Sequence, residues 1–271
     1  MTVLMLARDV DPSADRLVEK LAERGVPVFR TDLAAFPQAL TLDARLGPRG
    51  WDGVLASLDV LWVNYPSRES DALKPRQLHV ARRCGLQVPD SLVTNKPNAV
   101  REFARGISGA LAGKTLAAAL LVESGRLQVA YTHRIEPAEL DDLAGVNITL
   151  HFYQPFLSKA WEARITVVGD RVYGAAIHAG SDAARVDFRA DYDSLNYSVV
   201  KPPEPVTAGM LAFMNAFGLS FGAFDFAVTP DQEWIMFECN PFGAYGWLED
   251  ALDLPITAAL ADLLTNGATP C

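Results

Sequence analysis

The chain has 271 residues, a length that indicates one large domain or two smaller ones. Hydrophobic residues make up 50% of it and charged residues 21%, a composition that excludes a disordered chain. The 33 acidic residues outnumber the 24 basic ones, and the net charge is −9. Nucleic acids and anionic membranes reward clustered positive charge, so neither is expected as a partner, although a local basic pocket for phosphate is compatible with this balance.

Cysteine usage and the apolar runs indicate the compartment. No apolar run approaches the roughly 20 residues that span a bilayer. The apolar run at residues 3–6 follows no basic segment, which favours a strand over a signal peptide. Cys84, Cys239 and Cys271 lie far apart and form no CxxC pair, which excludes a zinc knuckle or a disulfide framework. We therefore expect a cytoplasmic protein in a reducing environment.

The amino-terminal segment is typical of a β-α-β unit. Residues 3–6 form a continuous apolar run, as in a strand buried on both faces. Residues 11–13 offer a helix start, and the helix that follows, with apolar residues on one face, stops at Gly25. Residues 26–29 then read as a second strand, parallel to the first. The first turn lacks the glycine fingerprint of a dinucleotide site, so such a site is disfavoured.

The next segment continues the α/β pattern without a clear linker. Residues 59–63 predict another buried strand, and residues 70–84 predict a helix that Gly85 closes. No internal repeat or low-complexity segment is present. The stretch 88–98, which contains proline and asparagine, is the best candidate for a domain boundary.

Residues 108–115, SGALAGKT, look at first like a phosphate-binding P-loop. That motif needs glycine six positions before the lysine, where this chain has Ser108, and it needs a preceding strand, where residues 98–105 predict a helix. Two interpretations of Lys114 are left: a surface lysine in a connection, or a lysine on a strand edge that contacts ATP phosphates. The residues around it do not decide between them.

A predicted hairpin follows, with Gly169 in its turn. Glu162 and Arg164 are two apart in its first strand, so their side chains leave the same face. By themselves they are equally compatible with a surface salt bridge of small value. The charged stretch 186–192 is, on its own, typical of a solvated loop.

The strongest signal is a second hairpin. Its first strand, residues 221–228, is apolar except for Asp225, and its return strand places Glu238 and Asn240 on one face. We expect Asp225 to lie opposite them across the hairpin. A carboxylate in an apolar strand is costly unless it is paired or metal-bound, and three such oxygen donors suit Mg²⁺. The alternative is a strand-end turn, with Asp225 bonded to a neighbouring side chain.

Three segments together resemble the ATP-grasp superfamily of carboxylate-amine ligases, and within it the maturases of graspetides, the ω-ester-containing, microviridin-type ribosomal peptides. These segments are QPFLSKAWEARITVVGDRV, AIHAGSDAARVDFRADYD and FGAFDFAVTPDQEWIMFECNPFGAYGWLEDALDLPITAALADLL. The resemblance implies an α/β (α+β) ATP-grasp fold in three parts. They are a shortened Rossmann-like domain at 1–90, a small central lid domain at 91–155 and a catalytic ATP-grasp domain at 156–271. The shortening would fall between Leu46 and Asp59.

The resemblance also implies site residues. Lys114 would hold ATP phosphates, the hinge residues Gln154, Phe156 and Leu157 would meet the adenine, and Glu162 would belong to the same nucleotide site. Arg164 and Arg189 would be catalytic, near the γ-phosphate and the acyl phosphate, and Asp225, Glu238 and Asn240 would bind Mg²⁺. The chain departs from the family at Pro155, at Phe242-Gly243, and in the segment GKTLAAA, where family members usually have Lys-Pro followed by a glycine-rich loop.

The function implied is an ADP-forming, ATP- and Mg²⁺-dependent ligase acting on a ribosomal precursor peptide with a leader and an acidic core. It would activate Asp or Glu side chains as acyl phosphates and join them to Thr or Ser hydroxyls or Lys amines, giving a macrocycle. One alternative is an ATP-grasp ligase for free amino acids or short peptides, since the fold does not fix the substrate. Another, motivated by the atypical lysine segment, is a non-catalytic protein that binds a peptide or nucleotide. Enzymes of the resembled family are often dimers, so the resemblance is compatible with a homodimer.

Overall fold

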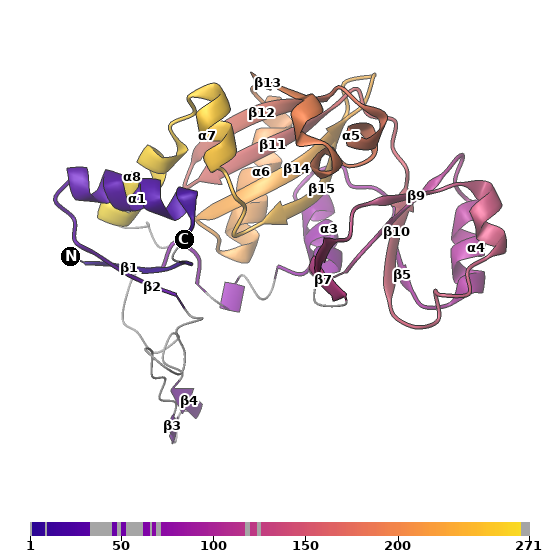
Figure 1. The fold of residues 1–271 in the computed structure, drawn as a ribbon, viewed down its shortest axis with the longest axis horizontal. Coiled ribbons are helices and arrows are strands. Elements are labelled where there is room, and N and C mark those ends of the chain that lie inside the picture. The colour runs from indigo at the N-terminus through magenta and orange to yellow at the C-terminus, as the bar shows by residue number, and fades with distance from the viewer. Residues whose placement is uncertain are drawn as a thin grey trace.

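The structure is a computed structural model, and Figure 1 shows its layout. It describes residues 2–8, 10–32, 45–47, 50–52, 62–65, 67–68, 72–116, 120–123 and 126–266. In those ranges no helix is both long and apolar enough to cross a membrane.

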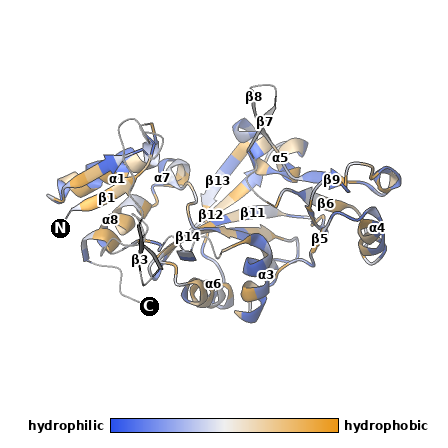
Figure 2. Ribbon diagram, turned by 90° about the horizontal axis from the view of Figure 1, so that it is seen from below, coloured by the Kyte–Doolittle hydropathy of each residue, from blue (hydrophilic) through white to orange (hydrophobic). Residues whose placement is uncertain are grey.

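The amino-terminal unit is the predicted β-α-β arrangement. β1 (Val3–Leu6) and β2 (Val28–Thr31) are parallel, and α1 (Pro12–Glu23) connects them. Helix α1 begins where the Asp11 carboxylate accepts two backbone N–H bonds of 3.1 Å. Its apolar face packs on both β1 and α8 (Ile256–Asn266), near the other end of the chain (Figure 2).

The middle part of the chain forms a four-stranded antiparallel sheet. In sheet order its strands are β5 (Leu92–Thr94), β10 (His151–Pro155), β6 (Leu111–Lys114) and β9 (His133–Ile135). Helix α4 (Pro97–Arg105) packs on it through Val100. The separate hairpins are β3 (Arg45–Gly47) with β4 (Gly50–Asp52), and β7 (Leu120–Glu123) with β8 (Arg126–Val129).

A five-stranded antiparallel sheet forms the carboxy-terminal half. In sheet order its strands are β13 (Leu195–Val199), β12 (Arg171–Ala179), β11 (Trp161–Val168), β14 (Phe221–Val228) and β15 (Trp234–Asn240). Between β12 and β13 the chain forms the short helix α5 (Asp182–Val186) and the single turns η3 (Phe188–Ala190) and η4 (Tyr192–Ser194). Both predicted hairpins are present, and Gly169 takes the φ of +61° that the turn from β11 to β12 requires.

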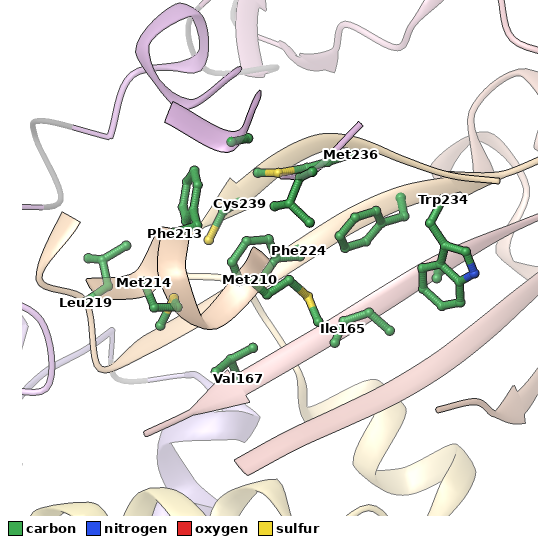
Figure 3. Packing of buried hydrophobic residues seen from close by; sticks show 14 of the residues in the cluster. Ile165, Val167, Met210, Phe213, Met214, Leu219, Phe224, Trp234, Met236 and Cys239 are labelled. Carbon is green, nitrogen blue, oxygen red and sulfur yellow. The ribbon is translucent and has the colours of Figure 1, made fainter. Parts of the chain in front are cut away.

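The two faces of this sheet have different roles. Helices α6 (Glu204–Phe217) and α3 (Lys74–Arg83) cover one face, where Ile165, Phe213 and Phe224 are fully buried (Figure 3). The opposite face is covered at one end by α7 (Gly246–Leu252) and α8. The rest of that face carries Glu162, Arg164 and Asp225, so the apolar layer behind it supports a charged surface.

Some predicted element boundaries differ from the structure. The second strand starts at Val28, two residues later than predicted. Helix α3 begins at Lys74 rather than at residue 70, because Leu73 before it is extended, with φ −71° and ψ 141°. Most of the strand predicted at 59–63, and most of the segment between Leu46 and Asp59 that carries the expected shortening, lie outside the described ranges. Next to it, Asn64 forms an isolated bridge rather than a strand.

Candidate active site

A cavity of about 490 Å³ is lined by residues of both large sheets. Its volume is within the roughly 300–1,000 Å³ typical of small-molecule sites. All ten residues singled out from the sequence line it: Lys114, Gln154, Phe156, Leu157, Glu162, Arg164, Arg189, Asp225, Glu238 and Asn240. Their common location fits one ligand site, while their individual roles stay predictions.

A row of charged residues crosses three neighbouring strands of the cavity floor. Arg164 on β11 is paired in register with Asp225 on β14, and Asp225 is paired with Glu238 on β15. Arg164 Nη1 donates to both carboxylate oxygens of Asp225 at 2.8 Å, and the two side chains are only 10% and 17% exposed. Asp225 therefore lies opposite Glu238, as the hairpin pattern predicts, and Arg164 pairs with Asp225 rather than with Glu162.

The pKa values of the two carboxylates in this row are shifted in opposite directions. Burial raises the pKa of Asp225, and the neighbouring Arg164 offsets only part of this effect. Burial also acts to raise the pKa of Glu238, but the positive charges of Lys74, Lys114 and Arg164 outweigh it and the pKa is lowered. The site thus keeps Glu238 ionised while the charge on Asp225 depends on its cationic partners.

A β-bulge shapes the floor next to this row. Asp225 pairs with Glu238, but the next residue, Phe226, pairs with Met236, so Phe237 is the extra residue of β15. Phe237 and Glu238 both line the cavity, while Met236 is fully buried in the core. The alternation of side chains along a regular strand cannot predict this pair of neighbours on one face.

Lys114 lies at the end of β6 and reaches into the cavity. Its Nζ is 3.0 Å from Gln154 Oε1 and 4.1 Å from the centre of the Phe237 ring. Gln154 in turn donates a 3.0 Å hydrogen bond to Ser91 Oγ. This position contradicts both the P-loop and the surface-lysine interpretations of Lys114. Burial lowers the pKa of Lys114 to about 8.

Two further lysines of the cavity were not identified from the sequence. Lys74 Nζ is 3.0 Å from Glu238 Oε2, and Lys159 Nζ is 2.8 Å from Glu162 Oε1. Lys159 precedes Glu162 by three residues, so this pair was visible in principle. Lys74 belongs to a helix far upstream of Glu238, and no local pattern connects the two.

The loop after β12 holds the second arginine of the site. Arg189 donates to Asp187 through Nε at 2.8 Å and Nη2 at 2.6 Å, and the backbone N–H of Thr132 donates to the same carboxylate at 3.0 Å. Burial acts to raise the pKa of Asp187, but these bonds outweigh it and lower the pKa to about 2. Asp187 is buried, so the interpretation of 186–192 as a solvated loop is wrong at this position, and Asp187 is a site residue that the sequence analysis missed.

The hinge at residues 154–157 offers few free backbone N–H donors to a ligand. The Phe156 N–H already donates to the Ala110 carbonyl at 2.9 Å, and Pro155 has no N–H. The Arg134 guanidinium lies 4.7 Å above the centre of the Phe156 ring. A purine base at this hinge would therefore use carbonyl groups and the backbone of Leu157.

The oxygen donors of Asp225, Glu238 and Asn240 fit a hard cation. Each carboxylate offers about four lone-pair sites, so the bonds from Arg164 to Asp225 and from Lys74 to Glu238 leave capacity on both. Asn240 Oδ1 accepts one 2.9 Å bond, from a backbone N–H two residues on, and keeps a second lone pair. Within the described ranges, no group of three or more His, Cys, Asp or Glu side chains could hold a metal, so a cation site with three protein ligands here includes the Asn240 amide. Such a set of few protein oxygens is the kind that Mg²⁺ accepts.

The chain has the fold of the ATP-grasp ligases, and its cavity is lined by the two large sheets. The chain is similar to the RiPP-associated ATP-grasp ligase of Chryseobacterium gregarium, solved in complex with ADP and a leader and core peptide. Identity is 22% and the TM-score 0.87, over 100% of this chain and 98% of that one. It is similar to macrocyclase MdnC of Microcystis aeruginosa MRC bound with precursor peptide MdnA, with 25% identity and a TM-score of 0.85 over 99% and 100% of the chains.

A third similar structure is the ATP-grasp ligase PsnB complexed with a phosphomimetic variant of its minimal precursor, Mg and ADP. Identity is 20% and the TM-score 0.76, over 97% of both chains. No protein-family model matches the chain, and no curated protein matches it. The relationship is therefore visible in the fold and hardly at all in the overall sequence.

Proposed function

We propose that this chain is an ADP-forming ATP-grasp ligase that closes macrocycles in a ribosomal precursor peptide. It would join Asp or Glu side chains of the peptide to Thr or Ser hydroxyls as esters, or to Lys amines as amides. The observation that carries the proposal is the charged row of Arg164, Asp225 and Glu238 in one cavity with Lys114 and Arg189. Similarity to ligases solved with ADP and precursor peptides supports it.

The charge of the cavity suits an anionic ligand. Five cationic side chains line it, against four acidic ones: Lys74, Lys114, Lys159, Arg164 and Arg189 against Glu162, Asp187, Asp225 and Glu238. In a protein of net charge −9, this local excess of positive charge would attract a nucleoside triphosphate and a peptide carboxylate.

ATP would be held by Lys114 at its phosphates and by Gln154, Phe156, Leu157 and Glu162 around its base and sugar. Mg²⁺, held by Asp225, Glu238 and Asn240, would supply charge neutralisation for the phosphates. Arg164 and Arg189 present guanidinium groups fixed by Asp225 and Asp187, so their donors are oriented before any ligand arrives. Such preorganised donors stabilise the charge that develops on a transferring phosphoryl group.

The proposed reaction has two steps, phosphorylation of the peptide carboxylate and transfer of the acyl group to the acceptor. A carboxylate oxygen of the peptide attacks the γ-phosphorus of ATP, the bond from that phosphorus to the β,γ-bridging oxygen breaks, and ADP leaves. The hydroxyl or amine of the acceptor side chain then attacks the acyl carbon, the bond to the phosphate oxygen breaks, and the leaving phosphate takes up the proton that the acceptor loses. The protein has to orient both partners and keep water from the acyl phosphate, and it needs no nucleophile of its own.

The proposal also includes the division into domains and the cellular location. The sheets are consistent with a Rossmann-like unit at 1–90, a lid at 91–155 and a catalytic domain at 156–271, because the strands of each large sheet fall inside one range. A cytoplasmic location is supported by Cys84 and Cys239, which are both free, as is usual in reducing compartments.

The test is to incubate the protein with candidate precursor peptides, ATP and Mg²⁺ and to follow peptide mass and ADP release. Each ester or amide removes one water from the peptide, and one ADP accompanies each bond. Condensation of free amino acids instead would favour the alternative ligase. Neither mass loss nor ADP release with any candidate would favour the non-catalytic alternative.

Two substitutions test the site directly. Asp225→Asn and Glu238→Gln should each lower turnover on the order of a hundredfold, because each replaces an anionic ligand of the Mg²⁺ that neutralises the transferring phosphate. Asp231→Asn is the matched control, since Asp231 is an exposed carboxylate in the turn of the same hairpin. Full activity of either site variant in saturating Mg²⁺ would contradict the metal assignment.

A further inference from the structure

A buried amide from the amino-terminal half holds the strand that carries the candidate metal ligands. Gln77, on α3, is 3% exposed. Its Nε2 donates to the Cys239 carbonyl at 2.8 Å and to the Ala72 carbonyl at 2.6 Å, and its Oε1 accepts the Cys239 N–H at 2.8 Å. One side chain thus satisfies both backbone groups of Cys239.

Strand β15 lies at the edge of the five-stranded sheet, so no other strand in the described part of the chain pairs with its outer backbone groups. The Met236 N–H is satisfied there by the Gln87 carbonyl at 2.8 Å. Gln77 takes the place of a strand at Cys239, with a donor and an acceptor spaced like those of a backbone. The edge is therefore fixed by α3 and the segment after it, not by the sheet itself.

Cys239 is the residue between Glu238 and Asn240. Its side chain is buried in the core beside Phe213 (Figure 3), while its two neighbours face the cavity. Fixing both peptide groups of Cys239 therefore sets where the Glu238 and Asn240 side chains begin. Lys74, one turn before Gln77 on the same helix, pairs with Glu238 at 3.0 Å and adds a second constraint from α3.

A second buried amide fixes the other side of the same strand pair. Asn64, 6% exposed, donates through Nδ2 to the carbonyls of Phe221 at 2.9 Å and Pro241 at 3.0 Å. Its Oδ1 accepts the N–H groups of Ser220 at 2.9 Å and Phe221 at 3.1 Å. Asn64 thereby ties the start of β14 to the residue that follows Asn240.

We propose that Gln77 and Asn64 are positioning residues that hold Glu238 and Asn240 in the geometry needed for the divalent cation. The inference rests on the proposed function, because it takes these two side chains as metal ligands. Partners that orient metal ligands are known to alter metal affinity by about 10- to 100-fold when they are removed. Neither amide faces the reacting groups, so each acts through the backbone of β14 and β15.

The test compares Gln77→Leu and Gln77→Glu with wild type. The leucine variant removes all three hydrogen bonds at similar volume, and the glutamate variant keeps an acceptor for the Cys239 N–H. Gln87→Leu is the matched control, because Gln87 is exposed and contacts β15 through its backbone carbonyl. The readouts are Mn²⁺ affinity of the ADP complex by electron paramagnetic resonance, the thermal midpoint, and kcat and KM for ATP.

We expect Gln77→Leu to bind Mn²⁺ at least tenfold more weakly, Gln77→Glu to lie between it and wild type, and Gln87→Leu to match wild type. The loss should appear in kcat more than in KM for ATP, and raised Mn²⁺ should recover part of it. Gln77→Leu or Gln77→Glu that is folded and binds Mn²⁺ like wild type would overturn the inference.

Two further comparisons keep the outcome decisive. If Gln77→Leu does not fold, Gln77→Glu and Asn64→Asp, which keep acceptors at the same positions, decide by the same Mn²⁺ criterion. The failure of the proposed function has a different signature: wild type itself, with ADP, would then bind Mn²⁺ no better than Asp225→Asn. In that case the metal site is wrong, whatever the Gln77 variants do.

Discussion

The low pKa of Lys114 gives a sharp prediction about nucleotide binding. Burial and the neighbouring Lys74 and Lys159 lower it from 10.5 to about 8, against the attraction of Glu238. Lys114 is therefore charged below pH 8 and neutral above it, whereas an exposed lysine stays charged until about pH 10.4. Because only the ammonium form attracts phosphate, nucleotide affinity should fall as the pH rises through 8.

The size of the effect follows from that pKa. If only protonated enzyme binds, the apparent Kd scales with one plus the ratio of neutral to charged lysine. Between pH 7.5 and pH 9 this factor rises roughly eightfold, equivalent to about 1.2 kcal/mol of binding free energy. The terminal phosphate, with a pKa near 6, stays ionised over this range and adds no slope of its own.

The assay is calorimetric titration with ADP at fixed Mg²⁺ over this pH range, on wild type, Lys114→Arg and Lys114→Met. Arginine stays charged throughout, so the Lys114→Arg profile should be flat. The methionine variant should bind weakly at every pH, also with a flat profile. A wild-type Kd that does not change between pH 7.5 and pH 9, or a methionine variant with the wild-type slope, would refute the reasoning.

Two other predictions follow from contacts around the arginines. Asp187→Asn should lower kcat at least tenfold, which corresponds to about 1.4 kcal/mol of activation free energy, with a smaller change in KM for ATP. The reason is that Arg189 loses the carboxylate that orients it. Steady-state kinetics check this, and an unchanged kcat contradicts it. Gly243→Ala would place a methyl group in overlap with the Ala223 Cβ and 2.6 Å from Arg164 Nη2, which should destabilise the fold by about 1–3 kcal/mol and lower activity. Calorimetric melting checks this against Gly145→Ala, where no atom lies within 4 Å of the new methyl group and no change is expected.

The strands and helices could be predicted from the sequence where one local rule decides them. The period-two pattern of 221–228 and its return strand places Asp225 opposite Glu238, and the structure has this register. Asp11 and Pro12 mark the start of α1 for equally local reasons. In such segments the residue pattern and the tertiary structure agree, so the sequence suffices.

The site could be predicted only in part, because several contacts join distant segments. Gln77 looks like a surface residue of a helix, yet it is bound to Cys239, 162 positions away. Lys74 and Asn64 are equally remote from the residues they contact. The bulge at Phe237 was missed for another reason, since an extra residue in a strand leaves no mark in an apolar run. Asp187 was within reach, two residues before Arg189, but a charged loop by itself carries no sign of burial.

The packing of α1 and β1 on α8 has a consequence for synthesis of the protein. Leu21 and Val3 share a small apolar cluster with Ala261, which the ribosome adds about 240 residues later. At 5–20 residues per second, this delay is roughly 12 to 48 s. During that time the two-stranded sheet lacks part of its apolar cover, in a nascent chain that is open to aggregation or chaperone capture. Asn64 and Gln77 likewise wait for β14 and β15, so the candidate metal site cannot be assembled before these two strands have been synthesised.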